Sequence, residues 1–404
     1  MQINIVTMLT TSPEIWWSPT TLEFQQIHAR GGTDWTTINL VDADGLAGQG
    51  EITSTQLSGS VAAITARLAN RLRGQRIASD DHVMQILGVT PEACEENQKL
   101  ATAVSALRCA VADALAQRAQ LPLAQYLRLT HDHEGELPDR VQLYANINRS
   151  LLPDDQGPVD RGPDDFAEMA VEAVNNGFTT IKCAPFDECQ APFDSTGLPH
   201  CAEAGLERVQ TIREAVGPDI TIFVDCHSRF DLDSALALEP ELRAAGGQWF
   251  EEPVDPVENS DDLRTIHEHA TLPIAGGEHA YGVNLFKRLV EEDILDIVMP
   301  DVKFCGGPVE AYRIGTELEP AYPGSVSMHC PSGPLSLLAS AHATIAFQNT
   351  LPLEHAVYEI DWRHELLEPF ERVENGHLII PQAPGLAARV DPAAVAFRGK
   401  TWTE

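Results

Sequence analysis

The hydrophobic pattern of the chain changes near residue 140. From that point, short apolar runs of strand length alternate with longer stretches that carry apolar residues at helical spacing. The predicted strands are Val141–Ala145, Thr179–Cys183, Ile220–Asp225, Gln248–Glu251, Pro273–Gly276, Ile297–Pro300, Ser325–His329 and Leu351–Glu354. The predicted helices between them include Phe166–Asn175, Leu206–Val216, Ser234–Ala245 and Leu285–Glu292. Eight strands separated by helices predict an α/β fold of the (β/α)-barrel type.

An open, doubly wound parallel sheet is the alternative arrangement for the same pattern. Such sheets often carry a G-x-G-x-x-G turn after the first strand, and no such motif follows the first strand here. The barrel is therefore the favoured fold.

Residues 1–135 have a different pattern. Short strands such as Thr36–Val41 come first, and amphipathic or apolar helices over Val61–Leu72 and Ala101–Ala119 follow. The polar stretch Thr130–Pro138 is typical of a linker. We therefore predict an N-terminal α+β domain, joined by this linker to the barrel.

The barrel is predicted to span residues 136–355. Residues 356–404 are rich in Pro and Ala and are expected to pack back on the N-terminal domain. Met1–Ile5 is predicted to be a strand and not a signal peptide, since it has no basic or long apolar stretch. No apolar run is predicted to span a bilayer, so a cytoplasmic protein without a membrane partner is expected.

The chain is strongly acidic, with 60 Asp and Glu against 27 Lys and Arg and a net charge of −33. This charge argues against a nucleic-acid partner, because no basic stripe is available for phosphates. A site for an anionic substrate would need local positive charge, which makes Lys182 and Lys303 candidates. The eight cysteines show no C-x-x-C spacing, which argues against a zinc site or a disulfide scaffold.

Three acids stand at the ends of successive predicted strands. Asp225, Glu251 and Glu278 are each separated by about one βα unit, so they are expected at the C-terminal mouth of the barrel. Converging carboxylates repel one another unless a cation neutralises them, and oxygen ligands favour Mg²⁺. For any one of these acids, capping of the next helix is the alternative role.

Further reactive side chains end the later strands. Asp301 and His329 would lie on neighbouring strands and form a general-base pair, in which the carboxylate fixes the imidazole tautomer. Glu354 ends the last strand. His227 lies two residues after Asp225, so strand alternation predicts that both point to the same side.

Lys182 ends the second predicted strand. It is either a second cation that stabilises charge on the substrate or an ion-pair partner of Glu251. Strand alternation predicts that Glu252, His279 and His355 face away, as solvated or helix-capping groups.

The roles of three other basic residues stay open at this point. Lys303, two residues after Asp301, would face inward or pair with a surface acid. Arg229 and Arg149 would grip the far end of a substrate or form surface ion pairs.

Five motifs in this order and spacing carry a resemblance to a known family. They are Asp225-Cys-His-Ser-Arg229, Phe250-Glu-Glu-Pro-Val254, Ile274-Ala-Gly-Gly-Glu278, Pro300-Asp-Val-Lys-Phe-Cys-Gly-Gly307 and His329-Cys-Pro-Ser-Gly-Pro334. Together they resemble the mandelate racemase subgroup of the enolase superfamily, and most closely its acid-sugar (galactonate-type) dehydratases. The resemblance covers most of the chain and implies a capping domain over an enolase-type barrel.

The resemblance also implies roles for residues. Asp225, Glu251 and Glu278 would bind Mg²⁺, and His329 with Asp301 would be the base. His227 would be the general acid, and Glu354 would hydrogen-bond the enolate oxygen. Capping-domain loops near Trp16, Trp17 and residues 48–53 would shape specificity for a small carboxylate substrate. The family also suggests a symmetric homo-oligomer.

One departure from the family pattern bears on the reaction. Racemases of this superfamily carry Lys-x-Lys at the second strand, whereas this chain has Lys182-Cys-Ala184. Loss of the second lysine favours dehydration to a 2-keto-3-deoxy acid. The alternatives are a racemase or epimerase that uses Lys182 against His329, a cycloisomerase, which would usually carry a lysine where Asp301 stands, and a non-catalytic barrel protein.

Overall fold

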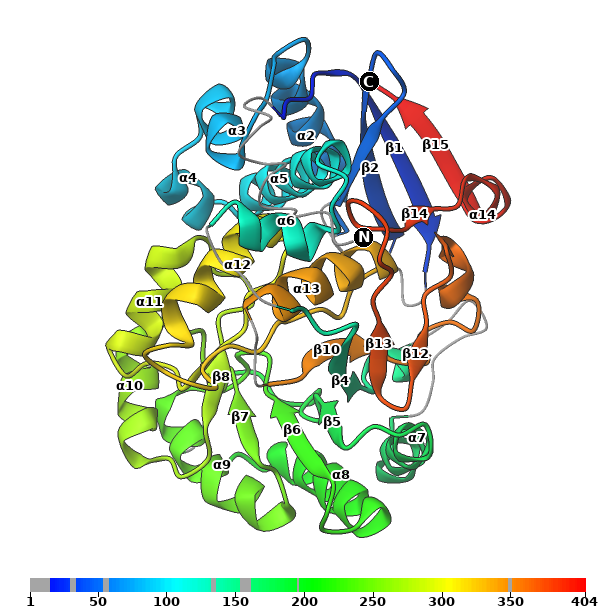
Figure 1. The fold of residues 1–404 in the computed structure, drawn as a ribbon. Helices are drawn as coiled ribbons and strands as arrows, with labels where there is room; N and C mark the ends of the chain where they lie inside the picture. Colours follow the sequence, from blue (N-terminus) through cyan, green and yellow to red (C-terminus); the bar gives the residue numbers. More distant parts are fainter. Residues whose placement is uncertain are drawn as a thin grey trace.

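The computed structural model describes residues 15–29, 34–53, 58–131, 136–152, 161–194, 196–347 and 351–404. Its N-terminal part, in blue and cyan, lies at one end of a barrel that runs from green to orange (Figure 1). The red C-terminal strand lies beside the N-terminal sheet. The predicted α+β domain followed by a barrel is confirmed, while the strand predicted over Met1–Ile5 lies outside the described residues.

The N-terminal domain is an antiparallel sheet covered by helices. The strand order is β15-β1-β2-β3, with β1 Pro19–His28, β2 Asp34–Asp42, β3 Ala47–Glu51 and β15 Gly399–Thr403. The helices are α2 Ser58–Leu72, α3 Asp80–Leu87, α4 Pro91–Glu95, α5 Gln98–Arg118 and α6 Leu123–Leu129. A Cβ at Gly50 would stand 2.2 Å from the Ala106 carbonyl oxygen, so glycine lets β3 lie directly on α5.

Seven parallel strands make most of the barrel. In spatial order they are β10 Leu353–Ala356, β4 Arg140–Asn146, β5 Thr180–Cys183, β6 Thr221–Asp225, β7 Trp249–Glu251, β8 Ile274–Gly276 and β9 Ile297–Val298. The surrounding helices are α7 Pro163–Asn175, α8 Ala202–Val216, α9 Leu232–Ala245, α10 Ser260–His269, α11 Val283–Glu291, α12 Gly307–Leu318 and α13 Pro334–Phe347. The ring of strands rules out the open doubly wound sheet.

The predicted strand Ser325–His329 is an extended segment with a single β-bridge, between Val298 and Val326. It nevertheless closes the ring. On one side, the His329 amide donates to the Pro300 carbonyl at 3.1 Å, and on the other the Glu354 amide donates to the Met328 carbonyl at 3.1 Å. This segment therefore carries His329 to the barrel mouth, as a strand would.

An aromatic cluster fills the barrel below the mouth. The rings of Phe223 and Trp249 stack with centroids 3.8 Å apart, and Tyr144 meets both edge-on. The Trp249 indole N–H donates to Glu251 Oε2 at 3.1 Å. The packed interior therefore also positions one of the acids at the mouth.

The C-terminal segment joins the two parts. After barrel strand β10 come η2 Arg363–Leu366, β11 Leu367–Glu368, β12 Val373–Glu374, β13 His377–Ile379, β14 Arg389–Val390, α14 Pro392–Arg398 and β15. β13 pairs antiparallel with barrel strand β4, and β15 pairs antiparallel with β1 of the N-terminal sheet.

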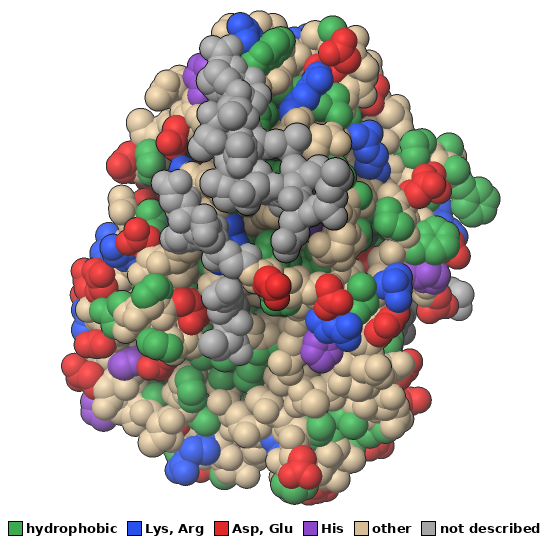
Figure 2. Space-filling view, in the orientation of Figure 1, with side chains coloured by type: hydrophobic (Ala, Val, Ile, Leu, Met, Phe, Trp, Pro, Cys, Tyr) green, Lys and Arg blue, Asp and Glu red, His purple; other side chains and the backbone are tan. Residues whose placement is uncertain are grey.

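Acidic side chains are spread over the face of the molecule in Figure 2 and do not gather in one patch.

Helix α5 corrects one prediction. It is long and apolar enough to cross a membrane by length and composition, although no such run was predicted. It is mostly buried between β3, α2 and α12, as the central helix of a folded domain. Its apolar composition therefore reflects burial inside the protein.

A buried ion-pair cluster joins the N-terminal domain to the barrel. Arg108 of α5 binds Asp80 of α3 at 2.6 Å and Glu310 of α12 at 2.7 Å. Its guanidinium also donates to the hydroxyl of Tyr281 at 3.2 Å. Because each buried charge depends on the others, this cluster specifies how the two parts dock.

His342 of α13 joins three parts of the chain. Its Nδ1 accepts from the Ala124 amide of α6 at 3.3 Å, and its Nε2 lies 3.1 Å from the Leu386 carbonyl of the C-terminal segment. The ring is fully buried, and burial lowers the pKa of His342 to about 4. These partners suit the neutral imidazole. Protonation of Nδ1 would remove the acceptor of the Ala124 amide.

We expect His342 to make the protein less stable in mild acid. The unfolded chain takes up a proton near pH 6.5, whereas the folded state resists until about pH 4. Between pH 7 and pH 5 the free energy of unfolding should therefore fall by about 2 kcal/mol more in the wild type than in His342→Gln. Urea unfolding at both pH values measures this difference, with the exposed His364→Gln as control. Parallel pH profiles for wild type and His342→Gln would contradict it.

Candidate active site

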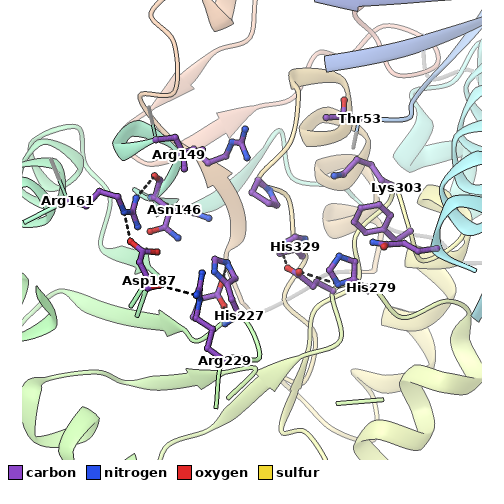
Figure 3. Close-up of a pocket in the computed structure, with 17 residues that line it drawn as sticks. Thr53, Asn146, Arg149, Arg161, Asp187, His227, Arg229, His279, Lys303 and His329 are labelled. Carbon is purple, nitrogen blue, oxygen red and sulfur yellow. Dashed lines mark hydrogen bonds and ion pairs between the residues drawn. The ribbon is translucent and has the colours of Figure 1, made fainter. Parts of the chain in front are cut away.

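A cavity of about 650 Å³ opens at the C-terminal ends of the barrel strands. Four of the predicted site residues line it: Asp225, His227, Glu278 and His329. Thr53 and Gln98 line it from the N-terminal domain, so that domain does contribute to the site. Figure 3 shows Arg149, Arg161 and Arg229 on one side of the cavity and Lys303 and His279 on the other, with His329 between them. Trp16 is exposed and Trp17 is buried, and neither lines this cavity.

The other four predicted residues do not line the cavity: Glu251 and Glu354 lie against Lys182, whereas Asp301 lies behind His329. This lysine has no exposed surface. Its Nζ lies 2.7 Å from Glu251 Oε1, 2.9 Å from Glu354 Oε1 and 3.9 Å from Asp225 Oδ2. The ion pair with Glu251, one of the two roles predicted for Lys182, is therefore present.

His329 and Asp301 form the predicted pair. Nδ1 of His329 lies 3.0 Å from Asp301 Oδ2, and the other oxygen of Asp301 accepts from the Lys303 amide at 2.8 Å. Nε2 faces the acids of the mouth, 2.5 Å from Glu278 Oε2 and 3.6 Å from Glu354 Oε2. The carboxylate of Asp301 thus fixes the ring and leaves Nε2 as the atom that faces the cavity.

The charges of this cluster depend on one another. Burial favours neutral His329, but Glu278 and Glu354 hold the pKa of His329 well above its usual value. Burial would raise the pKa of Glu278, yet the neighbouring His329 brings it well below its usual value. The imidazolium–carboxylate pair is therefore the favoured state of these two residues.

His227 pairs with Asp225 through a turn. Strand β6 ends at Asp225, and His227 and Ser228 both have left-handed backbones, with φ of 49° and 54°. The His227 amide donates to Asp225 Oδ1 at 2.8 Å, and its Nε2 lies 2.9 Å from Asp225 Oδ2. The two side chains meet as predicted, but strand alternation is not the reason. The Asp225 charge raises the pKa of His227 to about 9, so its imidazole is protonated at neutral pH.

Asp225, Glu251 and Glu278 come from three successive βα units and supply the hard oxygen donors that Mg²⁺ prefers. Each carboxylate now meets a cationic side chain: His227, Lys182 and His329, respectively. Among the described residues, no group of three His, Cys, Asp or Glu side chains is already spaced to hold a metal. Burial, with Asp225 nearby, nevertheless raises the pKa of Glu251 to about 8, so Lys182 does not fully compensate the charge of this carboxylate. The donor set and this shortage of charge suit a divalent cation.

The predictions for three neighbouring residues were wrong in part: Glu252 and His355 are buried and not solvated, whereas His279 is exposed as predicted but lines the cavity. Glu252 is buried and accepts from the Gly277 amide at 2.8 Å and from the Ser228 hydroxyl at 3.3 Å. It therefore connects the loops that carry His227 and Glu278. His279 lines the cavity and lies 3.3 Å from Glu278, and His355 is buried. Strand alternation fails for His279 because β8 ends before it and the chain turns.

The three basic residues whose roles were left open by the sequence all line the cavity. Lys303 lines the cavity, with its Nζ 3.6 Å from Asp301 and over the ring of Phe304. Arg149 lines it while it binds the buried Glu359 at 2.6 Å. Arg229 lines it and donates to the carbonyls of residues 187 and 189.

The sequence pattern did not single out two buried residues that position the site. Asn146, at the end of β4, lines the cavity and donates to Glu354 Oε1 at 2.7 Å. Glu51, at the end of β3, accepts from the Gly333 amide at 3.0 Å and the Ser336 amide at 2.9 Å. Glu51 therefore caps α13 from the other domain and anchors the loop that follows His329. A polar residue at a strand end was the only available hint for either.

Two family descriptions match the chain. Residues 6–127 match the mandelate racemase / muconate lactonizing enzyme N-terminal domain. Residues 165–394 match the enolase C-terminal domain-like family. The two matches cover the N-terminal domain and most of the barrel.

Curated relatives and solved structures are similar over nearly the whole chain. D-xylonate dehydratase of Haloferax volcanii is 28% identical over 90% of this chain and 85% of its own. D-galactonate dehydratase of Pectobacterium atrosepticum is 26% identical over 91% of each chain. A member of the enolase superfamily from Salmonella Typhimurium shares the fold with a TM-score of 0.81 at 20% identity, over 96% of this chain and 99% of its own.

We expect Glu51→Gln to loosen the loop after His329. The substitution replaces one acceptor oxygen by an N–H group that faces a backbone N–H, at a helix N-terminus where negative charge is favoured. Loss of such a buried bond costs about 1–3 kcal/mol of unfolding free energy. Urea unfolding measures the loss, with Asp44→Asn as control, since that carboxylate is exposed in the same domain. Equal losses in the two variants would contradict the cap.

Proposed function

Because the chain belongs to the mandelate racemase / muconate lactonizing enzyme family of the enolase superfamily, we propose that it is a Mg²⁺-dependent sugar-acid dehydratase. The reaction removes the α-proton of the acid and expels the β-hydroxyl as water, which gives a 2-keto-3-deoxy acid. The observation that carries the proposal is the pair of histidines on one cavity, each bound to its own carboxylate: His329 with Asp301 and His227 with Asp225.

Asp225, Glu251 and Glu278 would hold the Mg²⁺. When bound, the ion would stabilise negative charge on the substrate carboxylate as a Lewis acid. Lys182 holds the two buried carboxylates behind the cavity close together, because its ammonium forms ion pairs with both Glu251 and Glu354. Glu354 accepts from Asn146, Lys182 and the Cys330 amide, so a hydrogen bond from Glu354 to the enolate would require this arrangement to change.

His329 acts as the general base. Nε2 faces the cavity side, and Asp301 holds the ring through Nδ1 and stabilises the imidazolium that forms. In the described state Glu278 keeps a proton on Nε2, so the base is ready only when Glu278 is engaged elsewhere. A role of Glu278 as a cation ligand therefore also serves the proton transfer.

His227 acts as the general acid. With a pKa of about 9, its imidazole carries a proton at neutral pH, and nearly half of its side chain is exposed to the cavity. A β-hydroxyl leaves as water only if it is protonated, and an imidazolium is a suitable donor. The two histidines thus divide the work of an elimination.

Ala184 and the burial of Lys182 favour elimination over epimerisation. Epimerisation needs a second base on the opposite face of the substrate, and Lys182 is enclosed by acids and does not line the cavity. The curated relatives are named dehydratases of D-xylonate, D-gluconate and D-galactonate. Aldonic acids of five or six carbons are therefore the proposed substrate class.

Proton NMR in D₂O with Mg²⁺, run against a set of aldonic and aldaric acids, tests the function. We expect new methylene signals of a 2-keto-3-deoxy acid. Loss of the α-proton signal without new methylene signals would contradict dehydration and favour the epimerase. A protein that changes none of these acids and binds no Mg²⁺ would be a non-catalytic barrel.

The two histidine variants should separate the two steps. We expect His329→Asn and His227→Asn each to lower turnover by about 10²–10⁴-fold. His227→Asn should still exchange the α-proton for deuterium, because the base is intact, whereas His329→Asn should not. Circular dichroism checks that both variants keep the fold. Exchange that survives in His329→Asn would remove this residue from the role of base.

Removal of Mg²⁺ should abolish turnover and also lower stability. Ligand binding at 100 times Kd stabilises a folded protein by about 2.7 kcal/mol, so Mg²⁺ should raise the melting temperature of EDTA-treated protein. Glu251→Gln should lose this shift, because one donor oxygen is gone. Glu292→Gln, which changes a carboxylate just after α11 and away from the cavity, is the matched control. An equal shift in both variants would place the ion elsewhere.

A further inference from the structure

The chain between β5 and α8 forms part of the cavity rim. Asp187 lines the cavity, and its carboxylate binds Arg161 at 2.6 Å. Arg229 donates to the carbonyls of Asp187 at 3.2 Å and Cys189 at 3.0 Å, and the Ala191 amide donates to the Arg229 carbonyl at 2.8 Å. The segment from Asp187 to Ala191 is therefore bound on both sides to residues of the cavity wall.

Two thiols meet where this rim loop returns to the barrel. Sγ of Cys189 lies 2.7 Å from Sγ of Cys201, just before α8. This separation is longer than a covalent S–S bond of about 2.05 Å, and it is short for two thiols that are not bonded. Cys189 is fully buried and Cys201 is partly exposed. Cys201 is thus the residue of the pair with solvent-exposed surface, and Cys189 is the buried one.

We propose that Cys189 and Cys201 are a redox-active pair that forms a reversible disulfide and ties the rim loop of the cavity to α8. The reagent class is a small-molecule disulfide. The remaining cysteines show a different setting: Cys94, Cys109, Cys183, Cys226, Cys305 and Cys330 are all buried. Among the described residues, the structure brings only this pair of sulfurs into contact.

The exposure of the two sulfurs sets the order of steps. The Cys201 thiolate attacks the small disulfide, forms a mixed disulfide and releases one small thiol. The sulfur of Cys189 then attacks Cys201 Sγ, forms the internal S–S bond and releases the second small thiol. The protein loses two protons and two electrons, and the reagent gains them as two thiols. Burial holds the pKa of Cys189 above its usual value. Cys189 therefore suits the second step, the attack on a neighbouring sulfur, better than the first step, the attack on a reagent from solvent.

Mass spectrometry of the whole protein, treated with oxidised glutathione and then with a reductant, tests the proposal. The oxidised protein should be lighter by two hydrogen atoms and should lose two reactive thiols on titration after unfolding. The reductant should restore both. Protein that keeps all eight thiols reduced would overturn the proposal. None of these measurements involves catalysis, so the result does not depend on the proposed function.

A digest with a protease that cleaves before aspartate locates the bond. Cleavage before Asp187 and Asp194 places Cys189 and Cys201 in separate peptides, 187–193 and 194–218, and places Cys183 in a third. The first two peptides should travel together until they are reduced. A link from either cysteine to Cys183 would overturn the assignment.

Single variants test the order of steps. Cys189→Ser should stop at a mixed disulfide and gain the mass of one glutathione, because Cys201 has no partner. Cys201→Ser should gain little, since Cys189 is buried. Cys94→Ser, which changes a buried cysteine of α4, should oxidise as the wild type does. Equal glutathione addition to both single variants would contradict the accessible–buried pair.

Thermal unfolding tests whether the bond suits the folded geometry. A crosslink that fits should raise the melting temperature of the oxidised wild type, because it restricts the unfolded chain. The same treatment should not raise the melting temperature of the double variant Cys189→Ser/Cys201→Ser. A lower melting temperature after oxidation of the wild type would show that the two sulfurs are not placed for a bond.

Discussion

The mouth of this barrel concentrates acidic side chains in a place where water is scarce. Glu251 and Glu354 are both buried, and Lys182 lies between them with no exposed surface. Buried carboxylates are tolerated only with compensating charge, because transfer of an ion out of water is costly. His227 and His329 provide the rest of this charge at the cavity. The same compensation explains why the histidines are protonated and why a divalent cation suits the acids.

The geometry of this cluster depends on how the two domains dock. Glu51 of the N-terminal sheet caps the helix that follows the His329 loop, and Arg108 of α5 binds Glu310 of the barrel. Thr53, close to Glu51, lines the cavity. The domain that helps to enclose the substrate is therefore the one that holds the base loop in place. Changes to the domain interface are expected to reach the chemistry through this loop.

The rim of the cavity is held by local contacts and not by the buried charges of the barrel mouth. Asp187 and the neighbouring backbone bind Arg161 and Arg229, so cations of an otherwise acidic protein are held around the cavity by local partners. The proposed thiol pair joins the two ends of this rim loop, with Cys189 beside the Arg229 contact and Cys201 just before α8. The catalytic centre thus depends on charge compensation inside the barrel, whereas the rim depends on contacts within one loop and its neighbours.

The sequence by itself determined the barrel, the N-terminal domain and the strands at or just beyond whose ends Asp225, Glu251, Glu278 and Asp301 lie, together with the extended segment that ends at His329. Periodicity shows where strands end, and parallel strands bring those ends to one mouth. Only the tertiary structure decided what happens beyond each strand end. There the chain turns, as at His227 and His279, and alternation no longer predicts direction. The contacts of Lys182, Asn146 and Glu51 join residues 69 to 285 positions apart, and no local pattern records which distant partner a buried polar group finds.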